Sequence, residues 1–421
     1  MENNYDLIVC GGGLTGVAAA VAAKRCGSGK VLLIERYGFL GGMATSGLVN
    51  PFMTYFKSQK PYEEQYQLIF GIFQEILDRL SKLDGLKNKC VFDAEIMKLV
   101  LNRMITENKI DILLHTFIEG VEKRGDSRIS AIRVANKSGV YSIYAKVFID
   151  CTGDADVSYM AGVPCKKGRD GDHFGQPMTM CFRVANVDRG KMPPRDEINK
   201  LYREAKARGE LQNPREDVLY FDTMHPDVVH FNTTRIIKKD ATDAEQLTQA
   251  EFDVREQCFE MFDFLKENVS GFENSYMQIT ASQIGVRESR RIVGKYVLTE
   301  DDVLSGRKFE DSVCYNAYNI DIHNPAGTGT VLKSLKPGDY YGIPYRCLLP
   351  VNIDNLLVAG RPISSTHEAH SSIRVMPSCT SIGQAAGTAA AMCIDKGILP
   401  GKLDFKELRN KLLETGAIHW L

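Results

Sequence analysis

Apolar positions near the start of the chain fall into short runs separated by a segment of small residues. Asp6–Cys10 and Lys30–Glu35 are apolar and partly β-branched, which is typical of buried strands. Thr15–Cys26 between them is rich in alanine, which predicts a helix that packs close to a sheet. A strand, a helix and a second strand in this order make parallel strands with a right-handed crossover. The pattern therefore predicts an α/β fold.

The segment that follows predicts helices and then more strands. Residues 62–109 read as helices with polar faces. Strands are expected at Ile112–Thr116, Ser130–Ala135 and Tyr141–Tyr144, with a buried strand at Lys146–Ile149. These elements complete the first part of a domain over residues 1–160.

The pattern changes from about residue 175 onward. Residues 178–187 and 228–237 read as strands of a mixed sheet, and Ala241–Asn268 reads as an amphipathic helix. We predict an inserted α+β substrate domain over residues 165–340.

The first pattern returns toward the C-terminus, with an apolar strand at Asn355–Ala359 and a helix at Gly383–Lys396. Residues 341–421 are therefore predicted to complete the first domain, which makes that domain discontinuous.

Composition narrows the class of protein. A chain of 421 residues is long enough for two or three domains. Its 52 basic and 53 acidic residues leave a net charge of −1, which offers no field for nucleic acid or an anionic membrane. The N-terminus lacks the features of a signal peptide, and no apolar run is long enough to span a membrane. The 11 cysteines show no framework spacing, so we expect reduced thiols and a cytoplasmic location.

A glycine-rich turn follows the first strand. Gly11, Gly13 and Gly16 in GGGLTG fit the G-x-G-x-x-G pattern, with Leu14 and Thr15 opening the helix. Such a turn lets a pyrophosphate approach the backbone at a helix N-terminus. At the end of the second strand, Glu35 is placed to accept hydrogen bonds from a ribose, and Arg36 follows it. The alternative is a tight structural turn without a ligand.

Three further segments could contact a dinucleotide. Gly41, Gly42, Met43, Ala44 and Thr45 offer bare backbone and a hydroxyl, although a glycine-rich loop without ligand would look the same. The run FIDCTGDAD ends an apolar strand at Thr152 and Gly153, and Asp156 follows. Near the C-terminus, Gly360 and Arg361 end another strand, and a helix is predicted to open at Ile382, Gly383, Gln384 and Ala385. The N-terminus of that helix could stabilise negative charge on a reduced flavin.

These segments together carry a resemblance that covers nearly the whole chain. ERYGFLGGMAT, the TGD after a buried strand, RESRRIVG and NLLVAGRPISSTHEAHSSIRVMPSCTSIGQAAGTAAA resemble the bacterial FAD-dependent oxidoreductase family, within the glutathione-reductase-like flavoproteins. The resemblance implies a Rossmann-type FAD-binding domain with a parallel sheet, and non-covalent FAD in an extended pose. It also implies an adenine end near Glu35, a flavin ring beneath the C-terminal helix and a cofactor contact at Ile118. Many relatives have Asp where this chain has Arg361, so Arg361 could instead meet a phosphate or the flavin edge. The chain contains no C-x-x-C run, so an iron–sulfur cluster is not expected.

Candidate catalytic residues lie in THEAHSSIRVMPS. His367 or His370 could accept a proton from a substrate as a hydride leaves for the flavin, and Arg374 could hold a carboxylate or an anionic flavin. The alternative is that the histidines only hydrogen-bond this segment. A metal site is rejected because no third ligand is evident.

A second charged run is QIGVRESRRIVG. Strand alternation would put Arg287 and Ser289 on one face and Glu288 and Arg290 on the other. Because apolar residues flank the run, at least one arginine is expected to point inward and to need an anion. The resemblance makes Arg287 and Arg291 candidate site residues, whereas a solvated ion-pair network is the alternative.

The predicted function is hydride transfer between a small polar metabolite and FAD. A non-redox FAD isomerase or lyase, and an electron-transfer subunit of a larger complex, remain alternatives. A second G-x-G-x-x-G after a strand is missing, as is a C-x-x-x-x-C pair. The second electron partner is therefore open among NAD(P)H, oxygen, a quinone and another protein.

We predict that flavin reduction depends on the 367–374 segment and not on a thiol. Cys379→Ser should keep FAD and most activity, because no second cysteine stands beside it. Among His367→Ala, His370→Ala and Arg374→Ala, at least one should slow reduction by about 10²–10⁴-fold. Anaerobic half-reaction kinetics of each variant measure this. If Cys379→Ser is inactive while the other three variants reduce the flavin at the parent rate, a thiol mechanism is established instead.

Overall fold

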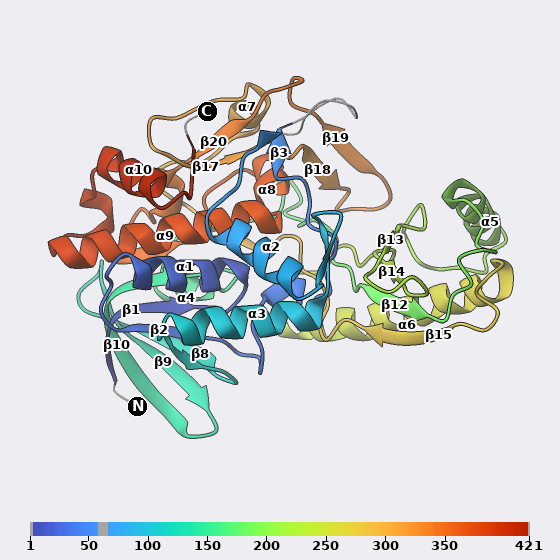
Figure 1. Cartoon of the computed structure of the whole chain (residues 1–421), viewed down its shortest axis with the longest axis horizontal. Helices are drawn as coiled ribbons and strands as arrows, with labels where there is room; N and C mark the ends of the chain where they lie inside the picture. Colours follow the sequence, from blue (N-terminus) through green and yellow to red (C-terminus); the bar gives the residue numbers. More distant parts are fainter. Residues whose placement is uncertain (1–2, 58–65, 420–421) are drawn as a thin grey trace.

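A seven-stranded sheet forms the centre of the computed structural model, which describes residues 3–57 and 66–419 (Figure 1). Five of its strands run parallel. In spatial order these are β7 (Asp111–Leu113), β2 (Val31–Ile34), β1 (Asn4–Cys10), β10 (Gly139–Asp150) and β21 (Leu356–Val358). The parallel sheet predicted from the β–α–β pattern is therefore present, and strands from the two ends of the chain share it.

The strand β10 belongs to two different sheet regions. Its second half pairs in parallel with β1, whereas its first half pairs antiparallel with β9 (Ile129–Asn136). The antiparallel β8 (Phe117–Lys123), which the sequence did not predict, lies beside β9. The sequence predicted two strands, at Tyr141–Tyr144 and Lys146–Ile149, and this was wrong. The apolar pattern changes within one strand because only its second half is buried on both faces.

Alternate residues of β1 serve two cores. Leu7 and Val9 pack beneath the helices α1 (Leu14–Arg25) and α9 (Met376–Lys396). Ile8 packs in a second cluster on the opposite face of the sheet. Further helices accompany α1 and α9, namely α2 (Ile72–Lys82), α3 (Ala94–Glu107) and α10 (Phe405–Glu414), whereas α4 (Asp156–Met160) packs on the opposite face.

Two helix predictions need correction. The helix α9 begins at Met376 and not at Gly383, because Pro377 is tolerated in a first helical turn and the polar residues after it continue the helix. Within the predicted helical span 62–109, residues 62–65 lie outside the described part. Short strands also occur there, at β4 (Tyr66–Gln67), β5 (Leu86–Lys87) and β6 (Val91–Phe92), and β3 (Phe56–Lys57) pairs with β4.

Residues 178–286 form a separate lobe, here called the cap, with its own hydrophobic core (Figure 1). Its antiparallel sheet has the order β13 (Tyr220–Asp222), β14 (Val229–Phe231), β12 (Phe182–Ala185) and β15 (Tyr276–Thr280). The helices α5 (Arg195–Ala207) and α6 (Ala244–Asn268) belong to the same lobe. In Figure 1 the cap extends to one side of the parallel sheet.

The segment between the cap and β21 packs mostly against the first lobe. Its elements are β16 (Arg290–Ile292), paired with β11 (Cys165–Lys167), α7 (Glu300–Leu304), β17 (Ser312–Asn316), β18 (Ile320–His323), β19 (Thr330–Lys333) and β20 (Tyr341–Pro344). Leu298 and Val313 share a core with α1 and α9. The cores of the described residues thus separate near residue 290, and the 165–340 domain stays a prediction in its boundaries.

None of the helices within residues 3–57 and 66–419 is both long and apolar enough to cross a bilayer.

The two long helices α1 and α9 approach each other backbone to backbone. A Cβ at Gly383 would lie 2.2 Å from the carbonyl oxygen of Thr15, and a Cβ at Gly387 would lie 2.0 Å from that of Ala19. These distances are far below van der Waals contact, so only glycine permits this packing.

We predict that Gly387→Ala lowers the free energy of unfolding by about 1–3 kcal/mol, because its methyl group overpacks the helix contact. The matched control is Gly120→Ala in β8, where the nearest atom to the added Cβ is 3.7 Å away. That control should stay within about 1 kcal/mol of the parent. Urea unfolding followed by circular dichroism measures both. Equal stability of the two variants would contradict the packing argument.

Candidate active site

The three glycines after β1 have different structural roles. A Cβ at Gly11, whose φ is +102°, would lie 2.4 Å from the carbonyl oxygen of Cys151. A Cβ at Gly16 would lie 1.8 Å from the carbonyl oxygen of Gly11. At Gly13 the nearest atom is the Cα of Gly42, at 3.7 Å. Packing therefore requires the first and third glycines, whereas the second leaves open space before the N-terminus of α1.

That open space belongs to a cavity of about 560 Å³ between the first lobe and the cap. Many of the sequence-predicted residues line it. These are Gly11, Gly13, Leu14, Thr15, Glu35, Arg36, Gly41, Gly42, Met43, Ala44, Thr152, Gly153, Asp156, Arg287, Arg361 and Arg374. The other predicted residues lie outside the lining, namely Gly16, Thr45, Ile118, Arg291, Gly360, His367, His370, Ile382, Gly383, Gln384 and Ala385.

Glu35 is held at the end of β2 by backbone donors. Its Oε2 accepts a hydrogen bond from the Gly12 amide at 2.6 Å, and its Oε1 accepts one from the Tyr37 amide at 2.9 Å. Burial raises the pKa of Glu35 above its ordinary value. Each carboxylate oxygen has a second lone pair, so a hydroxyl in the cavity can still donate to Glu35.

The glycine loop after β2 packs directly against the first glycine turn. The Gly41 amide donates to the Gly12 carbonyl at 2.9 Å. Thr45, by contrast, turns its hydroxyl back to the Leu40 carbonyl at 2.8 Å. The loop thus presents backbone to the cavity, while the Thr45 hydroxyl closes the loop.

Acidic residues after β10 form ion pairs with arginines from other segments. Asp154 pairs with Arg361 at 2.5 Å, and Arg361 also donates to the Gly153 carbonyl at 2.8 Å. Asp156 pairs with Arg290 at 3.0 Å. Burial and two neighbouring carboxylates raise the pKa of Asp156 to about 6. Arg361 is thus neutralised by a carboxylate of this chain.

The N-terminus of α9 lines the cavity through Val375, Met376 and Cys379. The amides of a first helical turn lack intrahelical acceptors, so this end offers donors and a positive dipole to the cavity. Burial raises the pKa of Cys379 to about 12, and its thiol donates to the Ile373 carbonyl at 3.6 Å. Cys379 is therefore a protonated, hydrogen-bonded thiol at neutral pH. Gln384, deeper in the helix, accepts from the Ile72 amide at 2.8 Å.

The histidines of the predicted catalytic segment are buried beside the cavity and not in it. They lie on the short helix α8 (His367–Ile373). The Nδ1 of His367 is 2.8 Å from Oε2 of Glu288, and Glu288 also pairs with Arg291. His370 is fully buried, its ring nitrogens have no hydrogen-bond partner in the described part of the chain, and burial holds its pKa well below the ordinary value.

Strand alternation across the RESRR run was a wrong prediction, because β16 begins only at Arg290. Glu288 and Arg291 are instead joined in a buried pair, and Arg291 also donates to the Ser365 carbonyl at 3.1 Å. Arg287 also lines the cavity. Unlike Arg290 and Arg291, it has no carboxylate partner among the described residues.

Among the cavity residues that the sequence analysis missed, three polar ones lie on or next to β18, namely Tyr318, Asp321 and His323. The Tyr318 hydroxyl donates to Oδ2 of Asp321 at 2.9 Å. Burial and the Asp321 charge raise the pKa of Tyr318, so it remains a donor. Asp321 and His323 stand two residues apart on β18, and that spacing puts both on one face of a strand. The spacing was visible in the sequence, but the position of the strand was not.

Within residues 3–57 and 66–419, no group of three or more histidine, cysteine, aspartate or glutamate side chains is arranged to hold a metal ion.

A parallel sheet with a glycine turn, an acid after the second strand and a cavity at the carboxyl ends of the strands defines a dinucleotide-binding α/β protein. The model of the FAD dependent oxidoreductase family matches residues 6–412. The chain belongs to this family, and it is an FAD-dependent enzyme. No curated protein matches its sequence.

Solved structures are similar to the chain at low sequence identity. The p-nitrophenol 4-monooxygenase PnpA from Pseudomonas putida DLL-E4 has a TM-score of 0.51 and 10% identity, over 99% of this chain and 87% of that one. A geranylgeranyl bacteriochlorophyll reductase-like protein from Thermoplasma acidophilum has a TM-score of 0.48 and 12% identity, over 98% of this chain and 84% of that one. At such identity the first likeness shows the fold alone.

We predict that Gly13→Val prevents FAD uptake without unfolding the protein. Its side chain would enter open cavity space, where the cofactor needs close access to the backbone. Glu35→Ala should weaken FAD binding without abolishing it, because hydrogen bonds to a charged group contribute about 1.5–3 kcal/mol. FAD titration of the apoprotein, with circular dichroism as the folding control, measures both. Normal FAD binding by folded Gly13→Val would show that the glycine is only a turn residue.

Proposed function

We propose that this enzyme transfers a hydride between a small polar metabolite and non-covalently bound FAD. The observation that carries the proposal is that one cavity joins the glycine turn of the first lobe to a polar wall made by the cap and β18. A cofactor seated at the turn would leave the cap side of the same cavity for a second molecule. An electron carrier without its own substrate would not need a polar wall that can bind a second molecule beside the cofactor.

Residues of three segments would hold the cofactor. The open backbone at Gly13 and the N-terminus of α1 suit its pyrophosphate, and Glu35 suits its adenosine ribose. The N-terminus of α9 would lie near the ring and favour negative charge there. FAD, when bound, supplies an acceptor or donor of two electrons and one hydrogen.

Asp321 is the group we propose for proton transfer. It lines the cavity, and the nearest guanidinium, that of Arg374, is 4.0 Å away. Its Oδ2 is oriented by the Tyr318 hydroxyl, so the carboxylate can accept the proton of a substrate hydroxyl or amine as the hydride leaves the adjacent carbon. His367 and His370 lie outside the lining and do not fit this role.

The test is anaerobic bleaching of the yellow holoprotein by a panel of sugars, amino acids and hydroxy acids. We predict that Asp321→Asn retains FAD and slows reduction by about 10²–10⁴-fold, because the amide cannot accept the proton. Asp222→Asn is the matched control, since Asp222 is 55% exposed and pairs with Arg189 on the cap surface.

Two results would overturn the proposal. The first is reduction of Asp321→Asn at the parent rate, which would remove Asp321 from the mechanism. The second is a flavin that no member of the panel reduces while the protein converts one of them without net redox change, which would establish the isomerase or lyase alternative.

A further inference from the structure

Four arginines of the cavity, Arg287, Arg290, Arg361 and Arg374, differ in their partners. Arg361 and Arg290 each have a carboxylate within 3.0 Å. Arg287 donates only to neutral oxygens, at 2.8 Å to the Pro177 carbonyl, 2.5 Å to the Thr179 hydroxyl and 3.3 Å to Oδ1 of Asn232. In the described part of the chain, no ion pair therefore neutralises Arg287.

Arg374 is also incompletely partnered. Its Nη2 lies 3.4 Å from Oε1 of Gln176 and 3.4 Å from the Asp321 carbonyl, which are long contacts. Its buried Nε has no hydrogen-bond partner among the described residues. A buried polar donor left without an acceptor is costly, so Arg374 retains capacity for a ligand oxygen.

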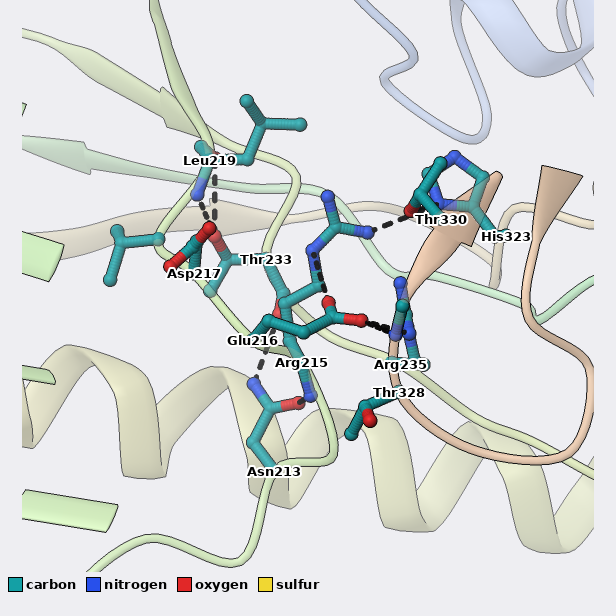
Figure 2. Close-up of polar contacts among 12 residues, drawn as sticks. Asn213, Arg215, Glu216, Asp217, Leu219, Thr233, Arg235, His323, Thr328 and Thr330 are labelled. Atoms are coloured by element: carbon teal, nitrogen blue, oxygen red, sulfur yellow. Dashed lines mark hydrogen bonds and ion pairs between the residues drawn. The ribbon is translucent and has the colours of Figure 1, made fainter. Parts of the chain in front are cut away.

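A third guanidinium, that of Arg215, adds positive charge near Arg287. Nη1 of Arg215 lies 3.4 Å from Nδ1 of His323. Figure 2 shows the two side chains on facing segments. Because a guanidinium only donates, Nδ1 accepts, and His323 then carries its proton on Nε2. Burial and the surrounding arginines hold the pKa of His323 well below its ordinary value, so the ring is neutral. His323 thus adds a donor to the same wall.

The loop of the β18–β19 hairpin fixes this arrangement against the cap. Arg235 pairs with Glu216 at 2.8 Å, and both are labelled in Figure 2. Arg235 also donates to the Gly327 carbonyl at 3.1 Å. Glu216 also accepts from the Gly329 amide. Glu216 is therefore occupied by Arg235 and the hairpin, and its closest approach to Arg215 is 3.8 Å.

We propose that the cap side of the cavity binds a substrate oxyanion, a carboxylate or a phosphate, with Arg287 and Arg374 as its charged contacts. This inference rests on the proposed function, because it names the chemical class of the metabolite. Arg287 has no carboxylate partner among the described residues, and Arg374 has only the Asp321 carboxylate, 4.0 Å away. An oxyanion would supply a closer counter-charge and the missing acceptors. Burial and neighbouring guanidiniums lower the pKa of Arg287 to about 9, so it remains charged at neutral pH.

The pyrophosphate of the cofactor is not the expected anion. Arg287 contacts Pro177, Thr179 and Asn232, and Arg374 contacts Gln176 and Asp321. None of these contacts involves the glycine turn at 11–16 or the loop at 41–45. The cofactor and substrate anions would therefore be bound by different segments.

The experiment titrates the holoprotein with malonate, inorganic phosphate and the neutral analogue malonamide. Perturbation of the flavin absorbance gives the dissociation constant, and the thermal unfolding midpoint is a second readout that needs no turnover. We expect malonate or phosphate to bind, and malonamide not to bind. Binding by malonate alone indicates a carboxylate substrate, and binding by phosphate alone a phosphate ester.

Variants assign the site. Arg287→Gln and Arg374→Gln should each weaken anion binding by about 10–100-fold, the loss expected for a charge-assisted contact. Arg287→Lys keeps the charge and tests whether the Gln variant fails only by misfolding. Arg203→Gln is the matched control, because Arg203 is 62% exposed and pairs with Asp217 on the cap surface.

Three results would overturn the inference. These are malonamide binding as tightly as malonate, parent-like anion binding by both Gln variants, and loss of FAD from folded variants. The last result would assign the arginines to the cofactor. If anions bind as expected but no metabolite reduces the flavin, the hydride-transfer proposal fails while the anion site stands.

Discussion

Close contact between α1 and α9 is the constraint on which the cavity depends. The two helices come from opposite ends of the chain, and Gly383 and Gly387 let their backbones approach without side chains between them. This contact sets the N-terminus of α1 and the N-terminus of α9 at one edge of the parallel sheet. Both helix ends can then act on a single extended ligand. Larger residues at this contact would move the two helix ends apart at the cavity.

Much of the cofactor half could be predicted from the sequence, because its signals are local. A glycine turn, a strand-ending acid and an alanine-rich helix each follow from a few adjacent residues. Gly13 and Glu35 therefore line the cavity as the pattern predicts. The start of α9 was misplaced because Pro377, Ser378 and Ser381 weaken the helix signal before Gly383, although tertiary packing fixes the helix there.

The cap side of the cavity could not be predicted in the same way, because its contacts join distant segments. Glu288 and His367 meet across 79 positions of sequence, and the pair turns a predicted catalytic histidine into a buried partner of a carboxylate. Asp321 reaches the cavity only because the β18–β19 hairpin folds back toward the cap. No local sequence pattern predicts that this hairpin folds back toward the cap. Two histidines close to a glycine-rich helix in the sequence were therefore a weaker indication of cavity-lining residues than the ion pairs of the folded chain.

The hairpin β18–β19 is held at both of its ends by different lobes. Its loop is bonded to Glu216 and Arg235 of the cap, while Ser371 on α8 accepts the Asp321 amide at 3.0 Å through its hydroxyl. A rotation of the cap relative to the parallel sheet would therefore pull on the strand that carries Asp321 and His323. The hairpin acts as a mechanical tether, through which the angle between the lobes sets the position of the polar wall.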